Sequence, residues 1–348
     1  MAVSRKCADL PLEGVLIPSA HKALAVTLAN HVPQGAPVAV ACSGGHDSAV
    51  LAVHVAVWAQ EHHVPCHLFH VHHGLQEPAD AWQARVHELA ARLNISCHSQ
   101  RVAVDTSCGQ GTESAARHAR YQAFSALVDF TGVRHVVMAH HLNDQAETVL
   151  LRLLRGAGPA GLAAMQECTD YGSYKVLRPW LSVPRSYIER SSAAFTAMCG
   201  WQAVDDPSNR DPRYTRSAVR ELLAPVLNQR WPGWTSILGR HAQQSAETAL
   251  ILHEVAQESL ALLDPSADNT CFSLARWRQL PPPRQALVLR YWLSLHNVRM
   301  PTQARLSDWL RQLRGVHAQG HDRQLQLQHE GCVIRCIRGR VVLISQKK

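Results

Sequence analysis

A glycine-rich turn between two apolar segments constrains the fold of this chain more than any other feature. Residues 37–42 form a short apolar run that predicts a strand, and residues 49–58 form one that predicts a helix. The turn between them consists of Ser43, Gly44, Gly45, His46, Asp47 and Ser48. In such a unit, glycines let backbone N–H groups converge on an oxyanion, and the helix N-terminus adds a positive dipole. The sequence therefore predicts a phosphate-binding loop.

The polar side chains of this loop also favour a phosphate ligand. The hydroxyl groups of Ser43 and Ser48 can donate hydrogen bonds to phosphate oxygens. Asp47 is the exception, because a carboxylate beside phosphates repels them unless a cation lies between. We therefore predict that Asp47 binds Mg²⁺ next to the phosphates. The alternative is an ordinary glycine turn in which Asp47 stands near the helix N-cap.

Residues 37 to about 180 alternate between strand-like and helix-like runs. The predicted strands are 38–42, 66–71, 99–104, 133–139 and 174–177. The predicted helices are 47–61, 79–93, 113–130 and 143–154. Strands rich in valine and other apolar residues are typical of a parallel sheet buried on both faces. The pattern predicts an α/β fold with an open parallel sheet, whose ligands bind beyond the carboxyl ends of the strands.

The pattern changes from about residue 214, where helical runs dominate. The predicted helices there are 215–227, 235–263, 284–295 and 302–313, and the predicted strands are 324–329, 332–337 and 340–344. Turn-forming residues are dense between Asp205 and Pro212. We therefore predict a catalytic domain over residues 1–212, followed by a smaller, mainly helical α+β domain over residues 213–348 that ends in a β-hairpin region.

Composition narrows the class of partner. The chain of 348 residues carries a formal net charge of +8 and has a pI near 9.1. A basic balance of this size favours a polyanion, and nucleic acid is the first candidate. The alternative is a basic surface that binds nothing. A hydrophobic content of 46% is typical of a globular chain and argues against disorder.

Membrane insertion and metal–cysteine chemistry find little support. The first ten residues lack the apolar core of a signal peptide, and the apolar stretch 49–59 is too short to cross a bilayer. We expect a cytoplasmic protein without a membrane partner. The ten cysteines include no C-x-x-C pair, which argues against zinc or iron–sulfur ligation.

Two histidine-containing segments follow predicted strands and are expected at the same crevice as the Ser43 turn. One runs from His70 to Gly74, and the other begins at His140. Adjacent residues such as His72 and His73 point apart on a strand, which argues against a shared metal. Contact of His72 with a nucleotide and a purely structural role both stay open.

The predicted helix 143–154 carries two carboxylates. Its apolar stripe is formed by Ala146, Val149, Leu150, Leu153 and Leu154. Asp144 and Glu147 fall outside that stripe, near the N-terminal end and the crevice. The pair could hold a cation or the ammonium group of a substrate. The alternative is that acidic residues favour a helix start through the macrodipole, and the sequence does not decide between the two.

Arginines gather in two places. Arg117 and Arg120 share a predicted helix with Tyr121, and a second group near the domain boundary includes Arg213, Tyr214, Arg216 and Arg220. Guanidinium forks suit phosphates, and aromatic rings suit exposed bases. The alternative is a solvated arginine face without a ligand.

Taken together, these motifs resemble the tRNA(Ile)-lysidine synthetase family of the PP-loop (N-type ATP pyrophosphatase) superfamily. The segments that carry the resemblance are 41–48, 70–75, 117–124, 139–148, 152–162, 206–209 and 214–216. The loop by itself indicates only the superfamily, whereas the ordered set is specific to the family. The resemblance covers residues 38 to about 225 strongly.

The resemblance implies a two-step reaction that uses ATP and Mg²⁺. ATP adenylates the C2 oxygen of the wobble cytidine, C34, of the isoleucine tRNA with a CAU anticodon, and diphosphate leaves. The amine of free L-lysine then displaces AMP and forms lysidine. A homodimer is compatible with this reading, although no residue pattern argues for one.

The resemblance also implies roles for individual residues. Catalytic roles fall to Asp47, Asp144, Arg117 and Arg216. Cofactor contacts fall to the loop Ser43–Ser48, His72, Gly74 and His140. Substrate contacts fall to Asn143, Asp144, Glu147, Arg152, Arg213 and Tyr214. The chain departs from the family pattern at Asn143, where an aspartate is usual, and at Ser217 and Ala218, where Asn-Arg is frequent.

Three other functions remain as alternatives. A tRNA thiolase on the same ATP loop would generally need a C-x-x-C pair. An ATP-dependent amidotransferase synthetase would need a glutaminase domain or partner. A non-catalytic RNA-binding protein with a vestigial ATP site fits the replacement at Asn143 but not the intact Ser43, Asp47 and Ser48.

Overall fold

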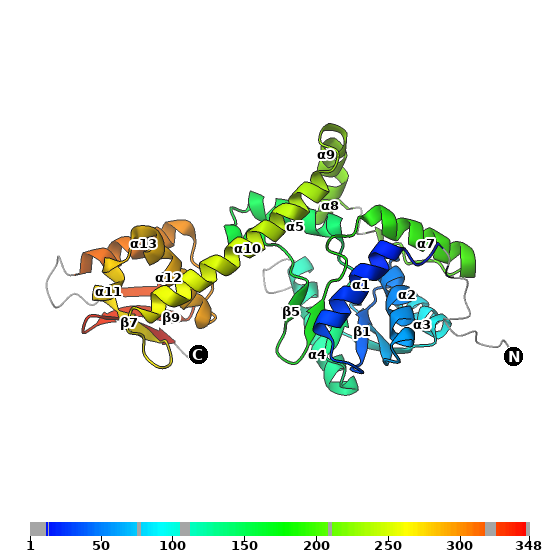
Figure 1. Cartoon of the computed structure of the whole chain (residues 1–348), viewed down its shortest axis with the longest axis horizontal. Coiled ribbons are helices and arrows are strands. Elements are labelled where there is room, and N and C mark those ends of the chain that lie inside the picture. The colour runs from blue at the N-terminus through cyan, green and yellow to red at the C-terminus, as the bar shows by residue number, and fades with distance from the viewer. Residues whose placement is uncertain are drawn as a thin grey trace. The chain divides into compact units, whose positions relative to one another are not determined.

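The computed structural model describes residues 12, 14–74, 78–104, 112–207, 211–316 and 325–345 (Figure 1). The chain forms two compact units, Met1–Gln244 and Ser245–Lys348. The division falls within the long helix α10 (Trp234–Ala261). The predicted domain boundary after residue 212 therefore lies inside the first unit, because the helical segment that follows it packs there.

The first unit is built on a six-stranded sheet with the order β3-β2-β1-β4-β6-β5. All neighbouring strands are parallel except β5, which runs antiparallel to β6 at one edge. The strands are β1 (Val38–Ala41), β2 (Cys66–His72), β3 (Ser96–Arg101), β4 (His135–Val137), β5 (Cys168–Asp170) and β6 (Lys175–Leu177). The predicted open, mainly parallel sheet is confirmed.

Helices separate the strands from β1 to β5, and further helices follow β6. The helices of the first unit are α1 (Pro18–His31), α2 (His46–Glu61), α3 (Ala79–Leu93), α4 (Thr112–Thr131), α5 (Leu142–Leu154), α6 (Pro159–Leu162), α7 (Arg185–Cys199), α8 (Thr215–Ala218) and α9 (Ala224–Arg230). A π-helical turn, η3 (Val219–Leu223), separates α8 from α9. The start of α10 completes the unit.

The sheet is buried on both faces, as its apolar strands require. Val38 and Val40 of β1 pack in one core cluster with residues of α1, α2, α3 and α7. Ala39, between them, packs in another cluster with Phe124 and Val128 of α4. Successive side chains of a strand point to opposite faces, so helices cover both sides.

The strand order places two loops together at the centre of the sheet. Strand β1 pairs with β2 on one side and with β4 on the other. The chain winds from β1 outward to β3 and then returns to β4, which makes the β1–β4 border a topological switch point. The loops after β1 and β4 leave the sheet side by side there, so this border is where a ligand is expected.

The second unit is smaller and has its own sheet and core. Its antiparallel strands, in the order β7-β10-β9-β8, are β7 (Cys271–Ser273), β8 (Gln326–His329), β9 (Cys332–Ile337) and β10 (Arg340–Ser345). Its helices are the end of α10 with α11 (Leu274–Gln279), α12 (Pro282–Leu295) and α13 (Gln303–Gly315). Trp277, Trp292 and Trp309 anchor the core against this sheet. The predicted α+β character is confirmed.

None of the helices in the described ranges has both the length and the apolarity needed to cross a membrane.

One buried histidine makes the first unit sensitive to acid. His54 of α2 is fully buried. Its ring meets Trp180 edge-on at 5.3 Å between centroids. Burial, with a smaller contribution from the charge of His21, lowers the pKa of His54 to about 3.

We predict that His54→Leu makes the free energy of unfolding less dependent on pH. In the unfolded chain His54 binds a proton near pH 6.5, whereas in the folded chain it stays neutral down to about pH 3. Stability is therefore lost as the pH falls below 6.5, by at most about 1.4 kcal/mol per pH unit for one group. Urea unfolding at pH 7.5 and pH 5 should show a loss that is smaller by about 2 kcal/mol in the variant. The exposed His118→Leu serves as the control, and an unchanged loss in His54→Leu would contradict the prediction.

Candidate active site

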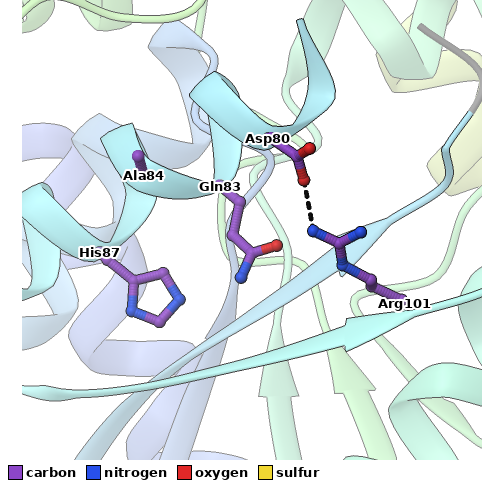
Figure 2. A pocket seen from close by; sticks show the side chains of 5 residues that line it. All are labelled: Asp80, Gln83, Ala84, His87 and Arg101. Carbon is purple, nitrogen blue, oxygen red and sulfur yellow. Dashed lines mark hydrogen bonds and ion pairs between the residues drawn. The ribbon is translucent and has the colours of Figure 1, made fainter. Parts of the chain in front are cut away.

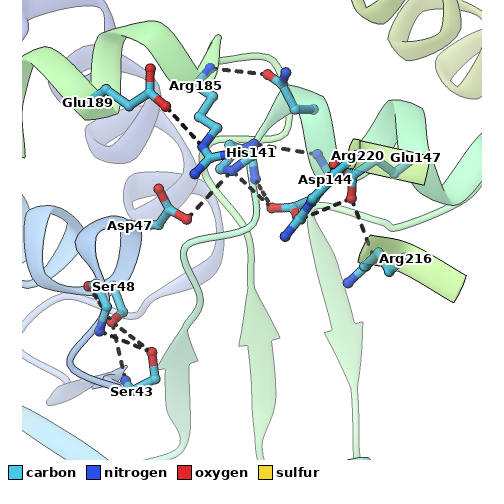
Figure 3. A network of polar contacts seen from close by, with 12 residues as sticks. Ser43, Asp47, Ser48, His141, Asp144, Glu147, Arg185, Glu189, Arg216 and Arg220 are labelled. Carbon is cyan, nitrogen blue, oxygen red and sulfur yellow. Dashed lines mark hydrogen bonds and ion pairs between the residues drawn. The ribbon is translucent and has the colours of Figure 1, made fainter. Parts of the chain in front are cut away.

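The loop after β1 is held in shape by its two serines. The Ser43 backbone N–H donates to Ser48 Oγ at 3.2 Å, and the Ser48 hydroxyl donates to the Gly45 carbonyl at 3.1 Å. The Gly45 N–H lies 3.4 Å from Ser43 Oγ. Helix α2 starts at His46 without a side-chain cap, so its first N–H groups remain open to an anion. Figure 3 shows this loop beside the contact network described next.

Gly44 is required by both its backbone conformation and its surroundings. Its φ of +88° lies in the region that favours glycine. A Cβ atom at this position would lie 2.9 Å from Val204 Cγ2 and 3.2 Å from Val86 Cγ2. The Val204 N–H also donates to the Gly44 carbonyl at 2.9 Å. The loop thus packs closely against Val86 and Val204 of the same chain, and position 44 cannot accommodate a side chain.

Asp47 has one carboxylate oxygen engaged and one without a partner. Its Oδ2 lies 3.7 Å from His141 Nε2. Its Oδ1 is buried and, within the described part of the chain, accepts no hydrogen bond. An orphaned carboxylate oxygen beside a phosphate-binding loop fits a divalent cation. His46, by contrast, is held by Ser192, whose Oγ lies 2.7 Å from His46 Nδ1.

The start of α5 brings a carboxylate pair to the same place. His141 caps the helix, its Nδ1 accepting from the Asp144 N–H at 3.4 Å while Asp144 Oδ2 accepts from the His141 N–H at 3.1 Å. Asp144 and Glu147 are both buried. The Arg220 guanidinium reaches Asp144 Oδ1 at 2.7 Å and Glu147 Oε1 at 2.7 Å. Arg216 lies 3.6 Å from Glu147 and donates to Thr148 Oγ1 at 2.9 Å.

The charges of this network reinforce one another. Burial lowers the pKa of His141, but the hydrogen bond to Asp47 and the charge of Asp144 outweigh it and raise the pKa above its ordinary value. Burial raises the pKa of Asp144, but the positive charges around it, with His141 first, lower it overall. His140 behaves differently, because burial lowers its pKa to about 3. The pKa of His141 is thus raised while that of its neighbour is lowered, and His140 stays neutral at neutral pH.

A small arginine-rich pocket adjoins the carboxylate pair. It has a volume of about 150 Å³ and contains four arginines but no acidic residue among its seven lining residues. They are Arg117, Thr148, Leu151, Arg152, Arg155, Thr215 and Arg216. Burial, and then the charge of Arg117, lower the pKa of Arg152. Such crowding of like charge indicates a site for an anion.

A second pocket, of about 350 Å³, is lined by residues of α3 and by Arg101 at the end of β3 (Figure 2). Asp80 and Arg101, which both line it, form an ion pair. His72 is buried and its Nε2 lies 3.1 Å from Asp80 Oδ1. Its predicted contact with a nucleotide stays a prediction. Gly74 adopts a φ of +65° at the end of the same segment.

Other predicted site residues stand outside the network. Arg213 is exposed and pairs with Asp211 at 2.6 Å, and Tyr214 is 39% exposed. Asn143 accepts the Arg185 N–H at 3.2 Å through its side-chain oxygen, which an aspartate would do equally well. Arg152 donates to the carbonyl groups of Gly161 and Ala164 and so anchors the chain after α6.

Sequence reasoning missed the roles of six residues in this region. His141 and Arg220 contact the carboxylates, and the pocket is also lined by Thr148, Leu151, Arg155 and Thr215. His141 was visible only as one of two adjacent histidines, and capping by histidine has no strong sequence signal. Arg220 was visible only as one member of a basic group.

Comparisons with known proteins show which family the sequence belongs to. A family model described as a PP-loop domain matches residues 19–227, and one described as the TilS substrate binding domain matches residues 272–342. A protein of Bordetella pertussis named tRNA(Ile)-lysidine synthase is 54% identical over 89% of this chain and 96% of its own length. One of Ralstonia nicotianae with the same name is 45% identical over 83% of this chain and 61% of its own length.

Among solved structures, the U34-tRNA thiolase NcsA from Methanococcus maripaludis is similar in fold. The TM-score is 0.55 at 15% identity, covering 66% of this chain and 78% of that chain. This likeness concerns the fold alone, and the named relatives do not favour a thiolase. With the PP-loop match over more than half of its length and relatives of this identity, the chain belongs to the tRNA(Ile)-lysidine synthase family.

Proposed function

We propose that this protein uses ATP to attach free L-lysine to C2 of the wobble cytidine of the CAU-anticodon isoleucine tRNA. In the first step the C2 oxygen attacks the α-phosphorus of ATP, and diphosphate leaves. In the second step a lysine amine attacks C2, and AMP leaves with that oxygen. One observation carries the proposal: a phosphate loop and a buried carboxylate pair meet through His141 at the switch point of the sheet.

The loop after β1 supplies the nucleotide site. Ser43, Ser48 and the uncapped N-terminus of α2 provide preorganised donors for phosphate oxygens. Asp47 would hold Mg²⁺ together with those oxygens, because its buried Oδ1 accepts no hydrogen bond within the described residues. When bound, Mg²⁺ stabilises the negative charge that develops on the phosphates.

The carboxylate pair supplies the amine site. Asp144 and Glu147 are buried, and burial strengthens their attraction for a positive group. The lowered pKa of Asp144 keeps it ionised at neutral pH. His141 joins this pair to Asp47, so that the amine and nucleotide sites share one network. A cationic amino acid is the substrate that such a pair fits.

The arginine pocket supplies a phosphate site for the RNA. It lies on the same helix as the carboxylate pair, since Thr148, Leu151 and Arg152 line it from α5. An RNA phosphate held there would place its nucleotide near the two sites above. The wobble base has to leave its stack to be modified, and a grip on the adjacent backbone supports that state. We assign further tRNA contacts to the second unit, and we expect a cytoplasmic enzyme that is compatible with a homodimer.

We predict that Arg155→Ala weakens tRNA binding and reduces its salt dependence. Arg155 is exposed at the end of α5 and lines the pocket. Loss of one phosphate contact should reduce the magnitude of the negative slope of log association constant against log salt concentration by about 0.7–0.9. Filter binding of the tRNA at several salt concentrations measures this slope. The matched control is Arg134→Ala, an exposed arginine that precedes the amino end of β4. An equal loss of tRNA binding in both variants would place the RNA elsewhere.

The proposal as a whole is tested by incorporation of radiolabelled lysine into unmodified tRNA(Ile) with a CAU anticodon. Incorporation should need ATP, and it should vanish when the wobble cytidine is replaced. Release of diphosphate without lysine attachment would retain the adenylation step and reject lysine as the nucleophile. If neither occurs with active-site residues intact, the proposed function is wrong.

A further inference from the structure

The carboxylate pair already holds a cation that belongs to the chain. Arg220 donates from Nε to Glu147 Oε1 at 2.7 Å, and from Nη2 to Asp144 Oδ1 at 2.7 Å and to Glu147 Oε2 at 2.9 Å (Figure 3). Hydrogen bonds of this kind between guanidinium and carboxylate are short and strong. Arg220 therefore occupies the position that the proposed function gives to the ammonium group of lysine.

Every carboxylate oxygen of the pair has a donor. Asp144 Oδ2 accepts from the His141 N–H at 3.1 Å, and the other three oxygens face Arg220. The side chains of Asp144 and Glu147 are only 11% and 5% exposed. An ammonium group from solution therefore competes with Arg220 for the same carboxylate oxygens.

We infer that Arg220 is a specificity-determining residue, which fills the ammonium site until a cationic amine displaces it. This inference rests on the proposed function and deepens it. Exchange of a guanidinium for an ammonium keeps the net charge constant, so the buried carboxylates never stand unpaired. A neutral amino acid has no charge to put in the place of Arg220 and is excluded.

The segment that carries Arg220 is suited to such an exchange. Val219–Leu223 is a π-helical turn between two short helices, and π turns are frequent at functional sites. The side chain of Arg220 is 27% exposed, so the guanidinium has a route to solvent. Arg216 stays bonded to Thr148, which leaves one cation beside Glu147 when Arg220 departs.

The test measures lysine affinity in Arg220→Gln and Arg220→Ala. In the wild type, lysine binds only the molecules in which Arg220 has left the carboxylates. If these are about a tenth of all molecules, removal of the guanidinium should tighten lysine binding by about 10-fold. Calorimetry of lysine binding and the KM for lysine should both show the gain. Arg220→Lys keeps an internal cation and should resemble the wild type. Arg190→Ala, an exposed arginine on α7, is the control.

Binding of ethylguanidinium separates this inference from the proposed function. Arg220→Gln should bind it more tightly than the wild type, whether or not lysine is ever transferred to tRNA. If the wild type fails to incorporate lysine but this difference in binding is present, the proposed function is rejected and the displacement of Arg220 by a cation is supported. Equal or weaker binding of lysine and ethylguanidinium by both neutral variants would overturn the inference, because Arg220 would then assist the amine instead of competing with it.

Discussion

Asp47→Asn is expected to lose ATP-dependent diphosphate release by about 10²- to 10³-fold, the effect of removing one preorganised charge partner from a developing phosphate charge. The variant keeps the size of the side chain and its contact with His141 but loses the charge of the buried Oδ1. Cation binding beside the phosphates should weaken, because amide oxygens bind Mg²⁺ less strongly than carboxylates. Diphosphate release with unmodified tRNA is the measurement.

The binding of tRNA to Asp47→Asn should remain close to that of the wild type, since Asp47 does not line the arginine pocket. Asp129→Asn, an exposed aspartate on α4, serves as the matched control for loss of one negative charge. Normal turnover in Asp47→Asn would reject the cation role. A parallel loss of tRNA binding would show that the substitution disturbs the loop as a whole.

Glu147→Gln is expected to raise the KM for lysine by about 10- to 100-fold, because a hydrogen bond to a charged group contributes about 1.5–3 kcal/mol. Glu147 is buried and accepts two hydrogen bonds from Arg220. Water therefore cannot replace its carboxylate as the partner of a positive group. Glutamine keeps the shape of the side chain. Adenylation should proceed nearly as before, because Asp47 and the serine loop are untouched.

The measurement for Glu147→Gln is therefore a pair of assays on one preparation, diphosphate release without lysine and lysine incorporation at increasing lysine. Glu189→Gln, an exposed glutamate paired with Arg185 at 3.3 Å, is the control for charge removal. An unchanged lysine KM would move the amine site away from Glu147. Loss of diphosphate release would indicate that the carboxylate also supports the nucleotide.

Local patterns predicted the elements around the site closely. The predicted helix 79–93 coincides with α3 (Ala79–Leu93), and the predicted strand 38–42 and helix 47–61 differ from β1 and α2 by one residue at an end. These segments have strong apolar patterns and clear turn signals, so residues close together in the sequence determine where each element begins and ends.

Elements defined by pairing were predicted less well. The strand expected at 99–104 is β3 at Ser96–Arg101, because its register is set by pairing with β2, from Ser96 opposite His67 to Arg101 opposite His72. Its residues are polar and mostly half-buried, so no apolar run marks its start. The edge strand β5 and helices α1 and α7 were not predicted at all.

By itself the sequence determined the phosphate loop, the α/β alternation and the ordered motifs, because each depends on residues a few positions apart. Only the tertiary structure decided how the charges pair. Arg220 lies 73 residues from Glu147 and 76 from Asp144, and packing alone brings them together. Likewise, the meeting of β1 and β4 places His141 beside Asp47. Interactions between buried charges depend on distance and burial, and neither can be read from the spacing of residues along a chain.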